Sequence, residues 1–349
     1  MNLTDFRTLG RTGLRVSPLA LGTMTFGDPS WGADEATSAE ILSRYLDAGG
    51  NFVDTANAYM GGRAEEVLGA YLGKRPGLRD RLVIATKFAL SMDPTDPNNG
   101  GTGRKAIRHH VDESLSRLGT DYIDLYWQHN WDRHTPLEET ISTLDDLVRE
   151  GKVRYVGLSD TPAWAVARMA TLAEWRGWTP IAAIQVEYNL LERTSEGELF
   201  GAARELGLGV LPWSPLANGV LTGKYTRDNQ NPAGAGRGMF VGRHLHEGTF
   251  RLLDALGRIA GELGTTVAAT ALAWVRQQPV VSSTIIGART VGQLEANLAS
   301  LDVTLSPEQL AELDGLTTPE LNFPAAFLRD FGVPAQQGNT VINGLRASA

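Results

Sequence analysis

Hydrophobic and polar positions along the chain repeat as one unit, in which an amphipathic helix ends at a glycine and a short apolar strand follows. In one such unit, Ile107, Val111 and Leu118 share one face of a predicted helix. Gly119 ends that helix, because glycine tolerates the left-handed conformation at a helix C-terminus. An apolar run over residues 122–127 follows and predicts a strand.

Apolar runs of this kind predict strands at residues 18–21, 51–54, 82–86, 122–127, 153–158, 181–186, 209–212 and 284–286. Strands that alternate with helices require a mostly parallel sheet with helices covering it. Eight units in a chain of 349 residues favour a closed (β/α)8 barrel, the TIM barrel fold. An open, doubly wound sheet is the alternative.

The ends of the chain depart from the repeat. Two short runs bounded by glycines, on either side of Arg11 and Thr12, predict a β-hairpin over residues 6–16 that closes the barrel bottom. Beyond Leu316, three prolines argue against another long helix, so we expect an irregular tail over the surface or toward the site mouth. The glycine-rich stretch 231–242 is expected to be a mobile loop. We therefore predict one domain over residues 1–349, with a barrel core at about 6–316 and a tail at 317–349.

Composition narrows the possible functions. The formal net charge of −8 argues against a nucleic-acid or anionic membrane partner, because binding phosphates needs an excess of Lys and Arg. The chain has no cysteine, which excludes disulfides, thiolate metal sites and a cysteine nucleophile. The N-terminus lacks a secretory signal pattern, and the longest apolar run is too short to span a bilayer. We expect a cytoplasmic protein.

In barrel enzymes the catalytic groups lie where strands give way to their βα loops. Polar or glycine residues occupy the ends of the predicted strands: Gly22, Thr23 and Met24; Asp54; Lys87; Gln128 and His129; Ser159 and Asp160; Gln185 and Glu187; Trp213 and Ser214; Gly287 and Arg289. One ring at the barrel mouth accommodates them all.

Lys87 is flanked by apolar residues, and an unpaired buried ammonium would cost several kcal/mol. Asp54, on the adjacent predicted strand, is its natural partner. Tyr59 follows five residues later, and a neighbouring lysine is expected to lower the pKa of its phenol from about 10, making it a general acid. The alternatives are that Lys87 extends to water, Asp54 caps a helix, Tyr59 is a packed aromatic and His129 is a core histidine.

The segments NFVDTANAY, ATKF and YWQHN resemble the catalytic tetrad of the aldo-keto reductases, with Asp54, Tyr59, Lys87 and His129 at the tetrad positions. The resemblance continues through GLSD, IQVEYN, PWSPLANGVLTGKY and IIGARTVGQLEAN, from about residue 6 to 316. It implies an enzyme that reduces an aldehyde or ketone with NADPH, without a Rossmann domain or a metal. Tyr59 would donate the proton, Lys87 and Asp54 would tune it, and His129 would orient the carbonyl.

The resemblance also implies a cofactor site. Ser159 and Gln185 would hold the carboxamide, Trp213 would stack on the nicotinamide, and the loop 214–223 would follow the pyrophosphate. The adenosine end would meet the segment after the eighth strand, where Arg289 would clamp a 2′-phosphate. The expected cofactor-binding set is Gly22, Thr23, Met24, Asp54, Ser159, Asp160, Gln185, Trp213, Ser214, Pro215, Leu216, Gly219, Leu221, Gly223, Lys224, Gly287, Arg289, Gln293 and Asn297. The expected substrate pocket is Trp31, Tyr59, His129 and Trp131.

The sequence departs from the family pattern at the cofactor site. Asp160 stands where many members have asparagine, so it accepts hydrogen bonds but cannot donate them. Gly287 and Gln293 replace basic residues that some branches use on the 2′-phosphate, which leaves Arg289 as the main cationic candidate. These features favour NADPH over NADH through Arg289 alone.

Two other motifs suggest a different kind of site. The segment GTGRKA at 101–106 imitates a dinucleotide fingerprint, but the residues before it cannot form the strand that a Rossmann unit needs. Asp132 and His134 are metal ligands by type, yet they lack a third ligand at metal-site spacing, and a solvated loop is the preferred interpretation.

The function has two alternatives beside a broad aldehyde or ketone reductase. One is a reductase of keto-sugars, including nucleotide-linked deoxysugars. The other is a nicotinamide-nucleotide-binding regulatory subunit of a membrane channel, which the complete tetrad disfavours. No pattern in this sequence indicates the physiological substrate or the oligomeric state.

Overall fold

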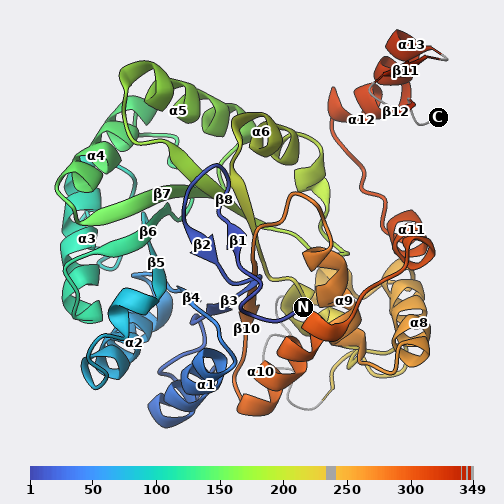
Figure 1. The fold of residues 1–349 in the computed structure, drawn as a ribbon, viewed down its shortest axis with the longest axis horizontal. Helices are drawn as coiled ribbons and strands as arrows, with labels where there is room; N and C mark the ends of the chain where they lie inside the picture. Colours follow the sequence, from blue (N-terminus) through green and yellow to red (C-terminus); the bar gives the residue numbers. More distant parts are fainter. Residues whose placement is uncertain (233–240, 339, 343–344, 347–349) are drawn as a thin grey trace.

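Eight parallel strands, hydrogen-bonded in the order β10-β3-β4-β5-β6-β7-β8-β9, form the centre of the molecule (Figure 1). The computed structural model describes residues 1–232, 241–338, 340–342 and 345–346. The strands are β3 (Leu19–Gly22), β4 (Phe52–Asp54), β5 (Val83–Phe88), β6 (Ile123–Gln128), β7 (Val153–Ser159), β8 (Ile181–Glu187), β9 (Gly209–Trp213) and β10 (Thr284–Gly287). Between β9 and β10, the amide of Ser282 donates to the carbonyl of Val210 over 2.9 Å. This hydrogen bond joins the two ends of the sheet into a ring of strands. The predicted barrel is therefore confirmed, and the open-sheet alternative is wrong.

Helices follow the strands and surround the barrel (Figure 1). They are α1 (Glu35–Asp47), α2 (Arg63–Gly73), α3 (Arg104–Leu118), α4 (Leu137–Arg149), α5 (Ala163–Arg176), α6 (Leu199–Leu206), α8 (Glu247–Glu262), α9 (Val267–Arg276), α10 (Val291–Leu298) and α11 (Pro307–Leu316). Gly119, Gly177 and Gly207 end α3, α5 and α6 at φ values of 62°, 66° and 67°. These left-handed C-caps are the glycine signals on which the strand–helix repeat was predicted.

The barrel interior is filled by side chains and closed at one end. Strands β1 (Arg7–Thr8) and β2 (Arg15–Val16) pair antiparallel, and this hairpin lies across the barrel end in Figure 1. Leu9 and Val16 are fully buried there. Deeper inside, the ring of Trp127 packs against Gly157 so closely that a Cβ on Gly157 would lie 2.3 Å from it. The hairpin prediction is therefore confirmed, and the opposite end of the barrel carries the βα loops.

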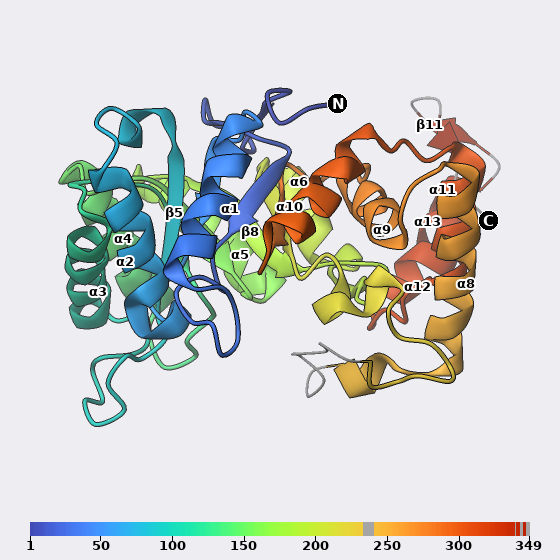
Figure 2. The same ribbon diagram turned by 90° about the horizontal axis from the view of Figure 1, so that it is seen from below.

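The tail beyond α11 forms only short elements: α12 (Ala325–Phe327), a π-helical turn (Leu328–Gly332), α13 (Val333–Gln337), β11 (Val341–Ile342) and β12 (Leu345–Arg346). The absence of another long helix among the described residues agrees with the prolines. The tail leaves α11 and extends away from α8 in Figure 1; Figure 2 shows the same elements from below. Its first part contacts the loop after β8, where side-chain atoms of Leu321 and Ala325 lie 3.3 and 3.4 Å from where a Cβ of Gly197 would stand.

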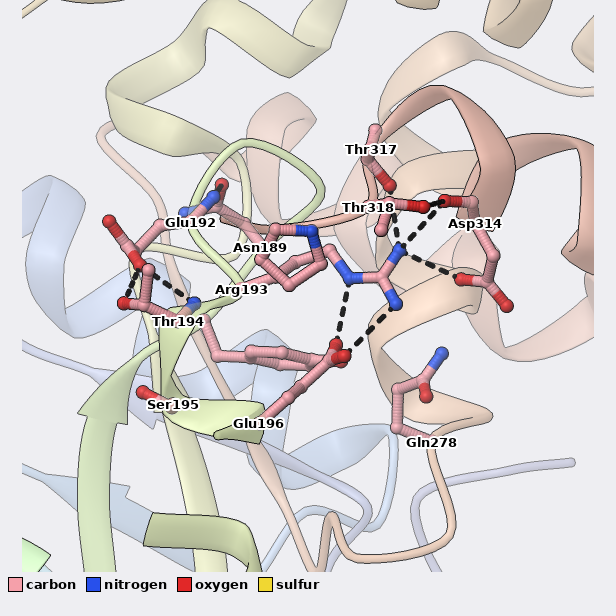
Figure 3. Close-up of polar contacts among 12 residues, drawn as sticks. Asn189, Glu192, Arg193, Thr194, Ser195, Glu196, Gln278, Asp314, Thr317 and Thr318 are labelled. Atoms are coloured by element: carbon pink, nitrogen blue, oxygen red, sulfur yellow. Dashed lines mark hydrogen bonds and ion pairs between the residues drawn. The ribbon is translucent and has the colours of Figure 1, made fainter. Parts of the chain in front are cut away.

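The tail starts from a partly buried ion cluster, drawn in Figure 3. Arg193, in the loop after β8, donates from Nε and Nη2 to the two carboxylate oxygens of Glu196, over 2.7 and 3.1 Å. Its Nη1 lies 3.0 Å from Oδ1 of Asp314 in α11 and donates to Thr317 Oγ1 over 2.8 Å. The planar guanidinium thereby links the β8 loop to the end of α11 and to the first residues of the tail.

Two sequence-based expectations concern segments at the margin of the described chain. The loop expected to be mobile, residues 231–242, falls mainly on residues 233–240, which lie outside the described residues. Among the residues that are described, no helix is long and apolar enough to span a membrane.

Candidate active site

The parallel register brings the polar strand ends to one face of the barrel. Gly22 pairs with Asp54 and with Gly287, Ser159 pairs with Gln185, and Lys87 pairs with Trp127. Strand β5 runs past residue 86, where the sequence predicted its end, so Lys87 lies inside the strand. The predicted ring of strand-end residues is therefore present.

Lys87 and Asp54 form a buried ion pair at the centre of this ring. Their side chains are 0% and 2% exposed, which excludes the alternative that the lysine reaches water. Lys87 Nζ also donates to the carbonyl of Thr55 over 2.8 Å and to the Tyr59 hydroxyl over 3.1 Å. Burial by itself lowers the pKa of the Lys87 ammonium, but Asp54 and Tyr59 raise it, with a net rise above the usual value. Lys87 is therefore charged and fully hydrogen-bonded.

The pKa of Tyr59 contradicts one prediction. The sequence suggested that Lys87 lowers the pKa of the phenol, whereas the pKa of Tyr59 is raised above its usual 10. Desolvation is the largest cause and outweighs the attraction of Lys87, while the carboxylate of Asp54 raises the pKa further. The neutral phenol is thus the stable form at physiological pH, which suits a proton donor.

His129 lies beside Tyr59, with ring centroids 5.8 Å apart in an edge-to-face arrangement. Burial, together with the positive charge of Lys87, lowers the pKa of His129 to about 3. Its Nδ1 is buried and has no hydrogen-bond partner in the described part of the chain, so His129 is not a satisfied core histidine. The imidazole is neutral, and Nε2 is the ring nitrogen left to meet a ligand.

Two hydrogen bonds join strand ends that are not neighbours. Gln185 donates from Nε2 to Oδ2 of Asp54 over 3.0 Å, across the barrel mouth. Trp213 donates from Nε1 to Oδ1 of Asp160 over 3.1 Å. Sequence reasoning missed both contacts, because partners on β4 and β8, or on β7 and β9, carry no shared local pattern.

Backbone strain concentrates on the same face. Positive φ values occur, among the described non-glycine residues, only in βα loops: Met60, Ala89, Asp160, Ser214, Ala217 and Asn218. Such conformations cost of the order of 1 kcal/mol or more each, and they cluster at ligand-binding and catalytic loops. No local sequence pattern had indicated this strain.

The loop after β9 is tightly turned. Ser214, Ala217, Asn218, Gly219 and Gly223 all have positive φ, at 51°, 47°, 55°, 93° and 80°. Ala217, Asn218 and Gly219 are consecutive, and the amides of Ala217, Gly219 and Gly223 donate to carbonyls of the same loop. The ammonium of Lys224 lies at this loop, 3.0 Å from where a Cβ of Gly219 would stand. This positive charge is compatible with the phosphate site that the resemblance implies.

The predicted adenosine-binding residues lie between the end of β10 and the end of α10. The amide of Arg289 donates to Gln293 Oε1 over 2.8 Å, and Asn297 Nδ2 donates to the carbonyl of Gly287 over 3.0 Å. Asn297 is 6% exposed, so its amide fixes the end of β10. Gly287 and Gln293 are exposed, and Arg289 is half-buried.

Trp131, one of the residues predicted for the substrate pocket, contacts a second tryptophan. Trp131 is partly buried and contacts the exposed Trp164 edge-to-face, with ring centroids 5.4 Å apart. Its amide donates to the carbonyl of Asp160 over 3.3 Å, which ties it to the end of β7. Trp31 lies in the loop after β3 and Met24 is 44% exposed. Trp164 was not predicted for this group.

The two competing motifs are structural. Residues 101–106 follow a long loop, and α3 begins at Arg104 without a preceding strand, so no Rossmann unit exists there. The carboxylate of Asp132 accepts from the amides of His134 and Thr102, over 2.8 and 3.1 Å, and from the hydroxyl of Thr135. Asp132 thereby organises its own loop.

Comparisons with known proteins agree with this geometry. Residues 18–318 match the model of the Aldo/keto reductase family. An uncharacterized oxidoreductase of Bacillus subtilis is 39% identical, covering 89% of this chain and 95% of its own. A norsolorinic acid reductase of Emericella nidulans is 38% identical over 93% of this chain and 84% of its own. An NADP(+)-dependent aryl-alcohol dehydrogenase of Phanerodontia chrysosporium is 33% identical over 91% and 87%. With the barrel and its strand-end ring, these matches establish that the chain is an oxidoreductase of the aldo/keto reductase family.

Proposed function

We propose that this protein reduces aromatic aldehydes or ketones to alcohols with NADPH, and that Tyr59 is the proton donor. The observation that carries the proposal is the contact of Tyr59 with the buried Lys87–Asp54 pair at the barrel mouth. A phenol held by a charged ammonium and placed beside a neutral imidazole is a set of groups for protonating a carbonyl oxygen.

The residues would divide the work as follows. Bound NADPH supplies the hydride that reaches the carbonyl carbon. Tyr59, neutral at physiological pH, gives its proton to the carbonyl oxygen as negative charge develops there. Lys87 stabilises the phenolate that remains, and Asp54 keeps Lys87 charged in its buried position. His129, which stays neutral because of its low pKa, donates a hydrogen bond that orients the carbonyl.

Residues at the barrel mouth would bind successive parts of the cofactor. The amide nitrogen of Gln185 is engaged by Asp54, which turns its oxygen the other way, toward an amide donor such as a carboxamide. Ser159 and Asp160 lie beside it at the end of β7, and Trp213 offers an indole face. Lys224, after β9, suits the pyrophosphate by its charge, and Arg289, just before α10, suits a 2′-phosphate.

Aromatic substrates are favoured over keto-sugars. Trp31, Trp131 and Trp164 supply flat apolar surfaces rather than the polar groups that a sugar requires. The names of two relatives, an aryl-alcohol dehydrogenase and a norsolorinic acid reductase, point the same way for those proteins. A regulatory subunit is less well supported, because it would not need the buried tetrad.

The experiment that tests this function is the rate of NADPH oxidation with a panel of aromatic aldehydes, ketones and keto-sugars, with NADH in parallel. Carbonyl-dependent oxidation that is fastest with aromatic compounds supports the proposal. Faster turnover of keto-sugars would instead favour the sugar reductase. Tight binding of NADPH without any turnover would favour the regulatory subunit.

A further inference from the structure

Asp160 occupies an unusual position at the end of β7. Its backbone is left-handed, with φ at 41°, and its side chain is exposed at the barrel mouth. Its Oδ1 accepts the indole N–H of Trp213 over 3.1 Å. The carboxylate thus lies at the edge of the aromatic ring that is proposed to stack on the nicotinamide.

No basic side chain forms an ion pair with Asp160 among the described residues. Lys87 is the nearest basic group that acts on it, but the ammonium is already paired with Asp54. Glu187, the next acid along the mouth, faces Arg243 at 3.4 Å. Tyr59 and His129 are neutral, and Asp160 forms no ion pair within the part of the chain that the structure describes. The mouth therefore carries one uncompensated negative charge beside Trp213.

The pKa of Asp160 reflects how its surroundings exclude water. Desolvation is the largest influence on Asp160 and raises the pKa of its carboxyl, while Trp213, Lys87 and Ser159 lower it by smaller amounts. A positive charge placed next to the carboxylate of Asp160 would be stabilised by Coulomb attraction.

The proposed reaction creates such a positive charge. The hydride leaves the nicotinamide with both electrons of its C–H bond and bonds to the carbonyl carbon, while the proton from Tyr59 goes to the oxygen. The nicotinamide ring is neutral before this step and carries one positive charge after it.

We propose that Asp160 makes the cofactor site prefer oxidised over reduced nicotinamide, through the charge of its carboxylate. This inference rests on the proposed NADPH-dependent function. It assigns Asp160 as a positioning and charge-setting residue: it fixes the indole of Trp213 and favours NADP⁺ relative to NADPH. An enzyme with this preference is inhibited by its oxidised cofactor and carries out alcohol oxidation more readily than an uncharged site would.

The variant Asp160→Asn separates the charge from the hydrogen bond. An asparagine Oδ1 also accepts from the Trp213 N–H, and asparagine tolerates positive φ as well as aspartate does. The substitution therefore keeps the shape, the backbone and the indole contact and removes the charge alone. Asp160→Gly is the second variant, because glycine adopts this φ without strain and also lacks the charge.

The experiment measures the dissociation constants of NADP⁺ and NADPH by titration calorimetry for the purified wild-type protein and both variants. We expect the ratio of Kd for NADP⁺ to Kd for NADPH to rise about tenfold in D160N, the size of a charge interaction in partly solvated protein. D160G should shift the ratio in the same direction. A ratio unchanged in both variants, or an equal loss for both cofactors, would overturn the proposal.

Glu187→Gln is the matched control, since it removes a neighbouring acid that is already paired with Arg243. We expect E187Q to leave the ratio unchanged, and a shift as large as that of D160N would refute a specific role for Asp160. If the wild-type protein binds neither nucleotide, the proposed function itself fails. If it binds both and the ratio does not respond to Asp160, only this inference fails.

Discussion

Gln185 and Asp54, 131 positions apart in the chain, are joined by a 3.0 Å hydrogen bond from the amide Nε2 to the carboxylate Oδ2. The other oxygen of Asp54 pairs with Lys87. One carboxylate therefore orients both the ammonium proposed to act on Tyr59 and the amide proposed to hold the cofactor. Substitutions of Asp54 should therefore disturb both the ammonium of Lys87 and the amide of Gln185.

Tyr59→Phe should lower kcat by about 10³-fold, since it removes the only hydroxyl proposed to protonate the carbonyl oxygen. The phenyl ring keeps its packing beside His129, so the Kd for NADPH should stay within about twofold of wild type. Steady-state kinetics and calorimetry on the same preparation check both values. Substantial turnover in Y59F would exclude Tyr59 as the proton donor.

Lys87→Met should destabilise the fold by about 3 to 5 kcal/mol, because it leaves the Asp54 carboxylate buried without its counter-charge. Urea unfolding at pH 7 measures this loss. The double variant Lys87→Met with Asp54→Asn removes both charges and should recover much of the stability. Equal losses in the single and double variants would mean that the two charges are not coupled.

The pH profile of carbonyl reduction should be flat from about pH 5 to 9. His129, with its pKa at about 3, does not become protonated in this range, and Tyr59, with its pKa raised above 10, does not lose its proton. The rate should fall only at more alkaline pH, where the phenol ionises. A measured kcat/KM limb between pH 6 and 8 that disappears in His129→Asn would contradict the neutral assignment.

Stability should fall as the pH drops below 6.5. Burial lowers the pKa of His110, and burial with Lys87 lowers that of His129, so the unfolded chain binds protons that the folded protein excludes. Each histidine contributes at most about 1.4 kcal/mol per pH unit to this slope, starting at its unfolded pKa and ending at its folded pKa. Urea unfolding at pH 7, 6 and 5 should give a smaller slope for His110→Asn than for wild type. Parallel curves would count against a buried neutral His110.

Arg193→Met should cost about 2 to 3 kcal/mol of stability, because Glu196 and Asp314 lose the guanidinium that joins the β8 loop to α11. Thermal or urea unfolding measures this. The matched control is Arg168→Met, which breaks the exposed Arg168–Glu138 pair and should cost less than about 1 kcal/mol. Similar effects of the two variants would show that the Arg193 cluster has no special structural role.

Much of the fold was readable from the sequence. The strand runs and the helix-ending glycines depend on burial and backbone conformation, which local residue types decide. The same pattern placed Asp54, Lys87, His129 and Ser159 at strand ends, and parallel pairing then brought them to one face. Strand β5 continues through Lys87, beyond its predicted end at residue 86, but the strand-end residues still lie on one face.

What the sequence could not decide depends on distances between strands and on competing energies. The sign of the Tyr59 pKa shift came from desolvation exceeding the attraction of Lys87, a balance that depends on how much protein surrounds the phenol. The partners of Asp160 and Gln185 lie on strands distant in the chain, and only closure of the barrel brings them within hydrogen-bond distance. The sequence by itself therefore determined which groups are present and on which face they stand. The tertiary structure decided their hydrogen-bond partners and the sign of the pKa shifts, because both follow from three-dimensional packing.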